Sequence, residues 1–350
     1  MKKINEIVNL QKKIVPEIVE QIEERYLILK YILYHQPVGR RVLATKLNMA
    51  ENSVRNGIKV LKEAGLIQLS GIGMSITSAG QEMVDELSEY MDALNGLADL
   101  EKYLEQELSI GAVKIVSGDS ETDANTFLDL GRVASRVLSE LVEDNMVIAV
   151  SGGSTMANVA DSMRKYMPNT IVVPTRGGLG EHVERQANHV ASVMASKIGG
   201  KYRLLHIPEI LNDEALDALK LTDHSIGEIE QLIKNANVLI HSIGRADVMV
   251  GRRNHALKIA DKISRFGVGE ALGHYFDRDG KCIYTYCTNG FRLNDLVGVG
   301  KKIAVAGGKT KAEAIMAVIR AGCNDVLVID ESAASQIQSI IKSEKSQKTF

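Results

Sequence analysis

The chain has 350 residues, a net charge of −2, 4% aromatic residues and no tryptophan. Its length favours two or three domains, and the scarcity of aromatic side chains argues against a protein that binds single-stranded nucleic acid by base stacking. There is no run of about 18 apolar residues and no signal-peptide pattern at the amino terminus, so we expect a cytoplasmic protein that does not span a membrane.

Cysteine and histidine residues show no pattern of their own. The three cysteines, Cys282, Cys287 and Cys323, form neither an even disulfide framework nor a metal-ligand set, and the eight histidines are scattered. We therefore expect a reducing compartment, no metal and no cofactor.

Residues 1–24 are predicted to form an amino-terminal helical arm. Apolar residues from Ile4 to Ile22 recur at helical spacing, but Pro16 forces a break or a restart within this stretch. No residue type in the arm suggests chemistry.

Residues 25–80 have the pattern of a winged helix-turn-helix. The first helix of the motif is expected to turn three apolar residues inward, Val42, Leu43 and Leu47. After a turn at residues 48–51, the second helix has one apolar stripe at i, i+4, i+7 spacing, formed by Val54, Ile58 and Leu61. Gly65 is suited to end this helix, and residues 66–69 and 74–77 are expected to pair as the strands of the wing.

Polar and basic residues cover the rest of this motif. Between Gln36 and Ser78 there are six Lys or Arg residues and two acidic residues, although the whole chain is near neutral. A local positive face of this kind is what binding to duplex DNA requires. We expect base and phosphate contacts from Arg40, Arg41, Asn52, Ser53, Arg55, Asn56, Lys59 and Lys62. The alternative is a small three-helix protein-interaction domain with a solvated basic face.

Residues 81–110 are predicted to form one long linker helix. Positions at alternating 4-3 spacing, all apolar except Glu101, are Met83, Leu87, Tyr90, Leu94, Leu97, Glu101, Leu104 and Leu108. We expect this seam to pair the helices of two subunits and to set the spacing of two DNA-binding heads. The alternative is a helix packed on its own domain, because Gly96 and Glu101 both weaken a coiled coil.

Residues 111–343 alternate short apolar runs with helical stretches, and residues 344–350 are expected to form a tail. The predicted strands are 113–116, 146–150, 170–173, 203–207, 238–240, 303–306 and 326–329. This order predicts an α/β domain with a mostly parallel sheet wrapped in helices. In such sheets ligands bind at the carboxyl ends of the strands, near a topological switch point.

The first of three glycine-rich loops, residues 151–155, follows a buried strand and opens a helix that we expect over residues 156–167. Its glycines let backbone N–H groups approach an anion closely, and its hydroxyl groups add donors. The sequence therefore predicts a phosphate site formed by Gly152, Gly153, Ser154 and Thr155.

Two further strand ends carry such loops. The second loop, residues 174–180, places a guanidinium among exposed N–H groups, which suits recognition of phosphate or hydroxyl groups. Its expected ligand contacts are Arg176, Gly177, Gly178, Leu179 and, one turn later, Gln186. The third loop, residues 306–311, looks like a nucleotide P-loop but lacks the glycine which that motif requires at Ile303.

A glycine pair after one strand is often only a tight turn, but three such loops with Arg176 and Lys311 beside them favour anion binding. Arg252 and Arg253 add a cationic point, or they cap a helix or form surface ion pairs. Glu270 is either a hydroxyl acceptor for a sugar or a plain helix residue. We expect core or surface roles rather than catalysis from His182, His189, His241 and His274.

These loops, behind a winged amino-terminal motif, resemble a known family. Residues 150–155, 176–181 and 306–315 are similar to segments of the SorC/DeoR-like sugar-responsive bacterial transcription regulators. The likeness runs over nearly the whole chain and includes residues 115–120 and 252–254. It implies a repressor of glycolytic genes whose effector domain has the sugar-phosphate isomerase/deaminase type of fold without the activity, and so no catalytic residues. It also implies fructose 1,6-bisphosphate as the inducer, with related phosphosugars able to bind.

The resemblance also implies roles for particular residues. Gly152, Gly153, Ser154 and Thr155 would cradle one phosphate, with Ser154 standing where the family is expected to have threonine. The rest of the ligand would be contacted by Arg176, Gln186, Arg252, Glu270 and Lys311.

The expected partners are double-stranded operator DNA, a phosphosugar effector and further copies of this chain in a homodimer or homotetramer. An effector that prefers the DNA-free form lowers operator affinity by the coupling between the two sites, typically ~1–3 kcal/mol. Two other classes of protein stay open. One is a phosphosugar isomerase or deaminase with an accessory DNA-binding head, against which we find no convincing acid/base pair beside the cradle. The other is a DNA-binding scaffold without a ligand, which would leave the three loops and their cations unexplained.

Overall fold

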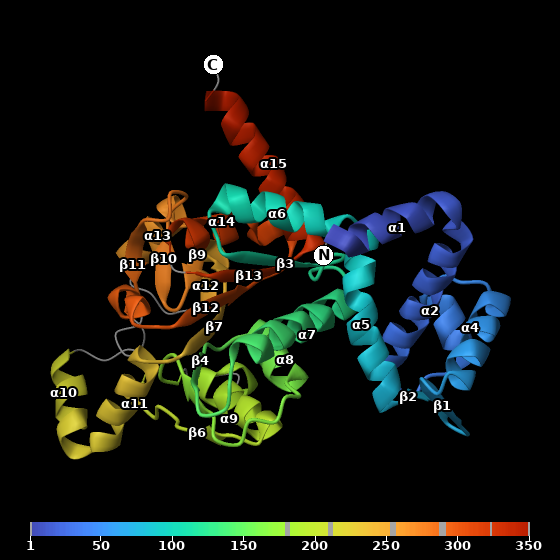
Figure 1. Ribbon diagram of the computed structural model, residues 1–350. Helices are drawn as coiled ribbons and strands as arrows, with labels where there is room; N and C mark the ends of the chain where they lie inside the picture. The colour runs from blue at the N-terminus through green and yellow to red at the C-terminus, as the bar shows by residue number, and fades with distance from the viewer. Residues whose placement is uncertain are drawn as a thin grey trace. The chain divides into compact units, whose positions relative to one another are not determined.

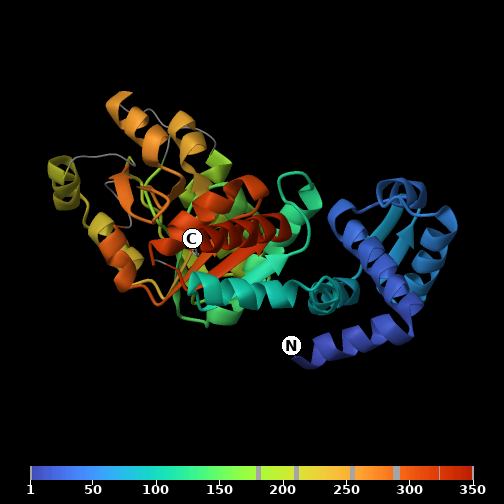
Figure 2. The ribbon, with the colours of Figure 1, turned by 90° about the horizontal axis from the view of Figure 1, so that it is seen from above.

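The computed structural model describes residues 2–178, 183–208, 213–252, 257–286, 292–322 and 324–348. The chain folds into two compact units, Met1–Asp99 and Leu100–Phe350, whose elements can be followed in Figures 1 and 2. Within the described ranges, no helix combines the length and the apolar character needed to cross a membrane.

The amino-terminal unit contains, in chain order, α1 (Lys2–Ile14), α2 (Pro16–His35), α3 (Arg40–Lys46), α4 (Glu51–Glu63), β1 (Ile67–Ser70), β2 (Gly73–Ile76) and α5 (Ser78–Leu94). The break expected at Pro16 is confirmed, because proline has no N–H to donate and suits the first position of α2. A separate arm ending at residue 24 is not seen, since α2 runs on to His35 and Val8 and Val19 lie in the same core as α4.

The order of helix, turn, helix and hairpin confirms the winged helix-turn-helix. Gly65 follows α4 with a φ of 74°, a left-handed conformation that glycine tolerates. β1 and β2 pair antiparallel, with Ile67 opposite Ile76. The inward direction predicted for Val42 is wrong. Val42 is 48% exposed and Leu43 is fully buried, because successive helix residues point about 100° apart.

The linker predicted as one helix is two helices, α5 and α6 (Leu97–Leu108). Gly96 has a φ of 70°, which breaks the helical backbone between them. Part of the apolar seam is buried within the chain, since Leu94 belongs to the core of the amino-terminal unit and Leu104 is fully buried. These residues fit the alternative interpretation, a helix packed on its own chain, and pairing between subunits stays a prediction.

A seven-stranded parallel sheet with the order β3-β13-β12-β7-β4-β5-β6 forms the centre of the carboxyl-terminal unit. Its strands are β3 (Ala112–Val116), β4 (Val147–Val150), β5 (Ile171–Pro174), β6 (Lys201–Tyr202), β7 (Val238–Ser242), β12 (Lys301–Val305) and β13 (Val326–Asp330). The predicted parallel α/β fold is confirmed, but the strand predicted at 203–207 is wrong. β6 ends at Tyr202, and the Leu205 N–H and carbonyl bond to the Asn188 side chain instead of a strand.

Helices cover both faces of this sheet (Figure 1). On one face, α7 (Ala124–Leu141), α8 (Ser154–Ser162) and α9 (Ala187–Ile198) share a core with Ile148 and Val172. On the other face, α10 (Asp213–Thr222) and α11 (His224–Lys234) pack with Ala149 and Val173. α8 is shorter than predicted, since the chain is extended at Met163 and Pro168 disfavours a helical Met167.

A second, antiparallel sheet with the order β11-β10-β9-β8 was not expected from the sequence. Its strands and the helices beside them are β8 (Gly244–Arg245), α12 (Ala246–Arg252), α13 (Leu257–Phe266), β9 (Gly269–Ala271), β10 (His274–Phe276) and β11 (Cys282–Thr285). β9 lies against α14 (Ala312–Arg320), where a Cβ on Gly269 would stand 2.8 Å from the Ala314 carbonyl oxygen. The last helix, α15 (Glu331–Lys348), includes most of the residues expected to form a tail.

Candidate functional site

The three glycine-rich loops lie at the carboxyl ends of neighbouring strands. They follow β4, β5 and β12, and only β7 stands between β4 and β12. From β4 the chain adds β5 and β6 on one side and then returns to place β7 on the other. This is the topological switch point at which open α/β sheets bind ligands.

The first loop, residues 151–155, is bound tightly to η1 (Val183–Arg185). A Cβ on Gly152 would stand 2.6 Å from the Arg185 carbonyl oxygen, so only glycine fits there. Gly153 has a φ of 111° and donates its N–H to the same oxygen at 2.8 Å. The Gly153 N–H is thus already used within the chain, which corrects the expectation that it points at an anion.

The start of α8 supplies the remaining donors of this loop. Its first-turn N–H groups have no acceptors inside the helix, the usual feature of an anion-binding helix start. Ser154 is exposed, and Thr155 is only 6% exposed. The loop is held against β7 by Ser242, whose N–H donates to the Ser151 hydroxyl at 3.2 Å and whose hydroxyl donates to the Gly152 carbonyl at 3.3 Å.

The second loop is fixed by its contact with Ile207. The Gly178 N–H donates to the Ile207 carbonyl oxygen at 3.1 Å. A Cβ on Gly177 would stand 2.1 Å from that same oxygen, so no other residue fits at this position. The close approach holds residues 176–178 at the end of β5.

Gln186 links the first two loops. Its side-chain oxygen lies 3.3 Å from the position that a Cβ on Gly178 would take, and its backbone lies 3.4 Å from the Cβ position of Gly152. The structure therefore brings Gln186, Gly152 and Gly178 together, as the site prediction requires. Arg176 is half-buried in the second loop. Leu179 lies outside the described residues.

Asp330 holds the third loop in place. Its Oδ2 accepts hydrogen bonds from the Gly308 N–H at 2.7 Å, from the Ser120 N–H at 2.8 Å and from the Ser120 hydroxyl at 2.5 Å. Asp330 is fully buried, and Gly308 has a φ of 100°. The short helix η3 (Lys309–Lys311) follows. Burial lowers the pKa of Lys311, while the charges of Glu121 and Asp330 act in the opposite direction.

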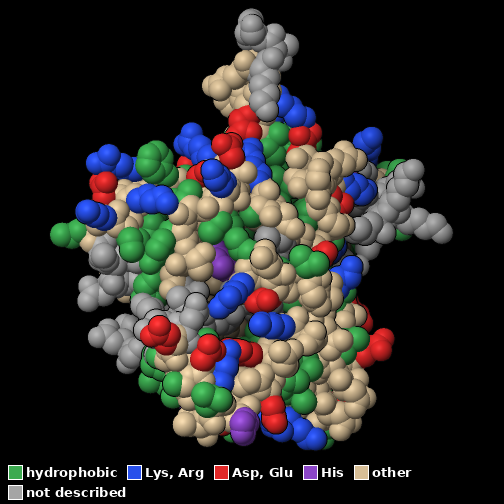
Figure 3. Space-filling model, turned by 90° about the vertical axis from the view of Figure 1, so that its left-hand side faces the viewer, with side chains coloured by type: hydrophobic (Ala, Val, Ile, Leu, Met, Phe, Trp, Pro, Cys, Tyr) green, Lys and Arg blue, Asp and Glu red, His purple; other side chains and the backbone are tan. Residues whose placement is uncertain are grey.

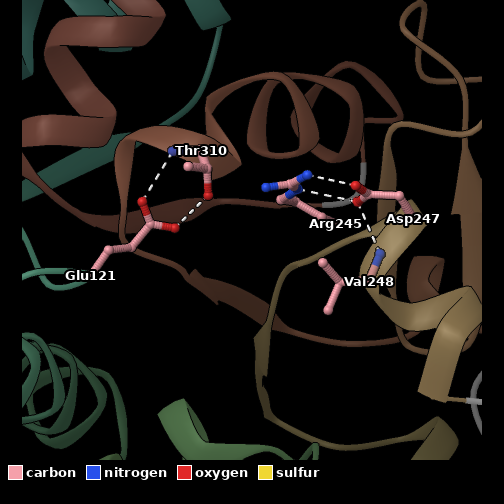
Figure 4. Close-up of polar contacts among 5 residues, drawn as sticks. All are labelled: Glu121, Arg245, Asp247, Val248 and Thr310. Atoms are coloured by element: carbon pink, nitrogen blue, oxygen red, sulfur yellow. Dashed lines mark hydrogen bonds and ion pairs between the residues drawn. The ribbon is translucent and has the colours of Figure 1, made fainter.

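The Glu121 carboxylate occupies the third loop. It accepts hydrogen bonds from the Thr310 N–H at 3.2 Å and from the Thr310 hydroxyl (Figure 4). A Cβ on Gly308 would stand 2.2 Å from the Glu121 Cγ. Sequence reasoning missed Glu121, although it directly follows the segment 115–120 on which the family resemblance partly depends.

Arg245 is a second residue that sequence reasoning missed. Its guanidinium donates to the Asp247 carboxylate at 3.1 and 2.5 Å (Figure 4). The hydrogen bond from Arg245 to Asp247 raises the pKa of Arg245, and the charge of Glu121 adds to this effect. The charge of Arg245 is thus coupled to Glu121, whose carboxylate bonds to the third loop.

Arg252 and Glu270, two further predicted ligand contacts, differ in their exposure to solvent. Arg252 ends α12 and is exposed, and its charge adds to burial in lowering the pKa of Lys311. Glu270 is 6% exposed in β9, so the interpretation as a plain helix residue is wrong. Its Oε1 accepts the Gly273 N–H at 2.8 Å, which uses one carboxylate oxygen in the turn before β10. Arg253 lies outside the described residues.

His241 and His274 are buried, and His189 is exposed, so each lies in the core or at the surface. His241 Nε2 is 2.7 Å from Asn324 Oδ1, and His274 Nδ1 is 3.0 Å from Thr285 Oγ1. Burial lowers the pKa of His241, and His189 is exposed.

Cys282 is a free thiol. His182, Cys287 and Cys323 lie outside the described residues. Within the described ranges, no three His, Cys, Asp or Glu side chains are grouped to hold a metal ion.

A pocket of about 330 Å³ opens beside the first loop. Ser154 lines it together with residues of both charges, Asp161, Glu184, Arg185 and His189. Charges of both signs are also interspersed over the face of the molecule in Figure 3. The lining of this pocket is therefore of mixed charge rather than purely basic.

The residues predicted to contact DNA lie on the outside of α3 and α4. Ser53 is half-exposed, and the exposed members are Arg40, Arg41, Asn52, Arg55, Asn56, Lys59 and Lys62. α4 buries its opposite face, formed by Val54, Ile58 and Leu61. A Cβ on Gly57 would stand 2.7 Å from Ile28 Cδ1, so α4 and α2 pack closely. α4 thus presents its polar and basic face outward, as a recognition helix does.

Family models match both parts of the chain. Residues 92–339 match a family model described as "Putative sugar-binding domain", and residues 21–91 match one described as "CggR N-terminal DNA binding domain". The central glycolytic genes regulator of Priestia megaterium is 38% identical over 335 residues, which cover 95% of this chain and 98% of that protein. The regulator of the same name from Bacillus subtilis is 37% identical, and the match covers 95% of this chain and 99% of that protein.

Two solved structures are also similar to this chain. A "putative SorC family transcriptional regulator" from Enterococcus faecalis is 38% identical with a TM-score of 0.63, and the match covers 69% of this chain and 99% of that one. The full-length sorbitol operon regulator SorC from Klebsiella pneumoniae is 16% identical with a TM-score of 0.63, and the match covers 89% of this chain and 97% of that one. At that identity the second likeness concerns the fold alone.

Proposed function

The chain belongs to the SorC family of transcription regulators with a sugar-binding domain, and we propose that it represses glycolytic genes until a phosphorylated sugar releases it from operator DNA. Fructose 1,6-bisphosphate is the inducer in this proposal. The amino-terminal unit reads the operator, and the carboxyl-terminal unit binds the sugar.

The arrangement of the three loops carries this proposal. Residues 151–155 and 176–178 lie together through Gln186, and residues 306–311 follow β12, two strands from β4 in the sheet. Backbone N–H groups at helix amino termini and Lys or Arg side chains beside them bind phosphate. Two groups of donors along one sheet edge suit a ligand with a phosphate at each end better than a ligand with one phosphate.

We assign one phosphate to the first loop. Gly152 and Gly153 shape the turn, while Ser154, Thr155 and the N–H groups at the start of α8 donate to the phosphate. Arg176 and Gln186 approach the same end of the ligand. This assignment differs from a cradle made of glycine N–H groups, since the Gly153 N–H is used by Arg185.

We assign the other phosphate to the third loop. Lys311 and Arg252 neutralise its charge there, since the charges of these two residues already act on one another in the free protein. Glu270 accepts a sugar hydroxyl between the two ends. Its buried position in β9 makes it a fixed acceptor.

Release of DNA follows from linkage. A sugar that prefers the DNA-free form lowers operator affinity by the coupling free energy, typically ~1–3 kcal/mol. α6 begins at Leu97, three residues after α5 ends, and its Glu101 and Glu105 carboxylates accept hydrogen bonds from N–H groups of β3. α6 therefore moves with the edge of the sheet. The active form is a homodimer or homotetramer in this proposal, because paired heads read symmetric half-sites.

Thermal melting of the full chain against a panel of phosphosugars tests the effector assignment. Fructose 1,6-bisphosphate should raise the melting temperature most, since stabilisation grows with ligand concentration over Kd. Product analysis with the tightest ligand follows. Chemical conversion of the sugar would support the rival enzyme, and stabilisation by none of the sugars would support a scaffold without a ligand.

A further inference from the structure

The third loop already holds an anion that belongs to the chain. The Glu121 carboxylate accepts two hydrogen bonds from Thr310, one from its N–H at 3.2 Å to Oε2 and one from its hydroxyl to Oε1 (Figure 4). A phosphate at this place would accept the same two hydrogen bonds from Thr310 through two of its oxygens. In the free protein the carboxylate thus stands where the proposed function puts a phosphate.

We propose that Glu121 is a built-in competitor of the effector, whose carboxylate must leave Thr310 before the second phosphate of the sugar can bind. This inference rests on the proposed function, because it concerns the same site. It makes Glu121 a residue that sets the affinity for a bisphosphate without holding the ligand.

The surroundings of Glu121 are those of a bound anion. Gly308 has no side chain, and only this leaves space for the carboxylate, because a Cβ would stand 2.2 Å from Glu121 Cγ and 2.6 Å from its Oε1. The charge of Glu121 acts on both Lys311 and Arg245. A phosphate in the same place would meet the same two cations and the same Thr310 donors. Two anions cannot share these donors without strong repulsion.

Glu121 can leave without a change in the loop that carries it. The neighbouring residue Ser120 is fixed by two hydrogen bonds to Asp330. The Glu121 N–H donates to Asp119 Oδ1 at 2.9 Å. The Glu121 side chain is exposed, so rotation about its own bonds takes the carboxylate into water. Asp330 also binds the Gly308 N–H, so the third loop keeps its shape while the carboxylate moves.

Glu121→Gln separates the charge of the side chain from its shape. The glutamine amide oxygen can still accept from Thr310, but it no longer repels a phosphate. We expect roughly two- to fivefold tighter binding of fructose 1,6-bisphosphate in calorimetric titration, the range for one partly exposed charge interaction. Fructose 6-phosphate, which needs only one phosphate site, should gain less. Glu121→Ala should give the same direction of change.

Glu140→Gln is the matched control, because it removes the same charge from an exposed position near the end of α7. It should leave both affinities unchanged. Unchanged or weaker bisphosphate binding by both Glu121 variants, or an equal gain for both sugars, overturns the inference and leaves the proposed function standing. If the wild-type protein and both variants bind neither sugar, the proposed function fails, and the inference fails with it.

A double-mutant cycle adds a test of the contact itself. Thr310→Val removes the hydroxyl that holds the Glu121 carboxylate, so Glu121→Gln should gain less bisphosphate affinity in that background than in the wild type. Gains of equal size in both backgrounds would show that Glu121 acts through its charge at a distance rather than by occupying Thr310.

Discussion

The Glu101 carboxylate of α6 accepts a hydrogen bond from the Ile115 N–H of β3 at 2.9 Å. Glu105, one helical turn later, accepts from the Val113 N–H at 3.0 Å. β3 is an edge strand of the parallel sheet, so two carboxylates bond to N–H groups that a further strand would otherwise pair. This contact explains why an acid interrupts the apolar seam at position 101.

Removing the Glu101 acceptor should destabilise the protein. Glu101→Ala leaves the buried Ile115 N–H without its acceptor, and we expect a loss of about 1–3 kcal/mol in the free energy of unfolding. Glu101→Gln keeps an acceptor oxygen and should cost less. Urea unfolding of the two variants and the wild type measures the difference. Alanine and glutamine variants of equal stability would show that the hydrogen bond to Ile115 contributes nothing.

Stability should also depend on pH through Glu101. Burial raises the pKa of this carboxyl above its ordinary value of 4.5, while Lys114 and the Ile115 N–H act against that rise. The folded state therefore holds the proton more strongly than the unfolded state. The contribution of this group to stability is fully present below pH 4.5 and is lost as the pH rises through the raised pKa. Relative to Glu101→Gln, the wild type should lose stability across that window, and a pH-independent difference in urea midpoints would contradict this.

The effector unit should be more stable on its own when α6 is kept. A fragment of residues 97–350 should bind phosphosugar and lose operator binding, since it retains the sheet and both carboxylates that cap β3. A fragment from residue 111, the boundary predicted from sequence, lacks these groups and the fully buried Leu104. It should melt at a lower temperature and aggregate through its exposed edge. Circular dichroism melts and gel filtration compare the two, and equal melting temperatures would mean that α6 is dispensable.

The second loop should tolerate no side chain at Gly177. A Cβ there would stand 2.1 Å from the Ile207 carbonyl oxygen, so Gly177→Ala should cost about 1–3 kcal/mol of stability and weaken sugar binding. Gly227→Ala is the control, because among the described residues no atom outside its own helix backbone and chain neighbours lies within 4 Å of its Cβ position in α11. Alanine there should stabilise by roughly 0.5–1 kcal/mol. Thermal melts with and without sugar measure both. Normal sugar binding by Gly177→Ala would remove the second loop from the site.

Two substitutions on α4 should separate base reading from phosphate contact. If Arg55 reads a base, Arg55→Ala should weaken operator binding by about 1–3 kcal/mol and affect random duplex less. Lys59→Ala should weaken binding to both duplexes and lower the salt dependence by about one released counterion. Fluorescence anisotropy at several salt concentrations provides the data, with the exposed Lys197 of α9 replaced by alanine as control. Equal wild-type affinity for operator and random duplex would exclude specific reading.

Elements with strong periodicity could be predicted from the sequence. The stripe of Val54, Ile58 and Leu61 fixed the position of α4, and buried apolar runs located six of the strands of the parallel sheet. The antiparallel sheet has strands of two to four residues, such as Gly244–Arg245, which are too short to show alternation. Residues 81–108 looked like one helix because their 4-3 spacing continues across Gly96, and only the backbone shows the break.

The loops of the candidate site could be predicted where they depend on local chemistry. Glycines after strands and the basic residues beside them can be recognised in the sequence, and the structure places these loops at neighbouring strand ends. Contacts between distant segments could not be predicted. The Arg185 carbonyl takes the Gly153 N–H, and Glu121 reaches Thr310 across 189 residues of chain. Such contacts depend on how the strands are ordered, which local patterns do not encode.

Operator release by sugar is the measurement that tests the central claim most directly. The full-length chain is bound to a fluorescent duplex of its own operator, and anisotropy is followed as fructose 1,6-bisphosphate or fructose 6-phosphate is added. We predict that the bisphosphate releases the duplex at concentrations where the monophosphate does not, and that Lys311→Ala reduces this difference. An operator affinity that stays constant while the bisphosphate raises the melting temperature would contradict the account, because the sugar would then bind without any coupling to DNA.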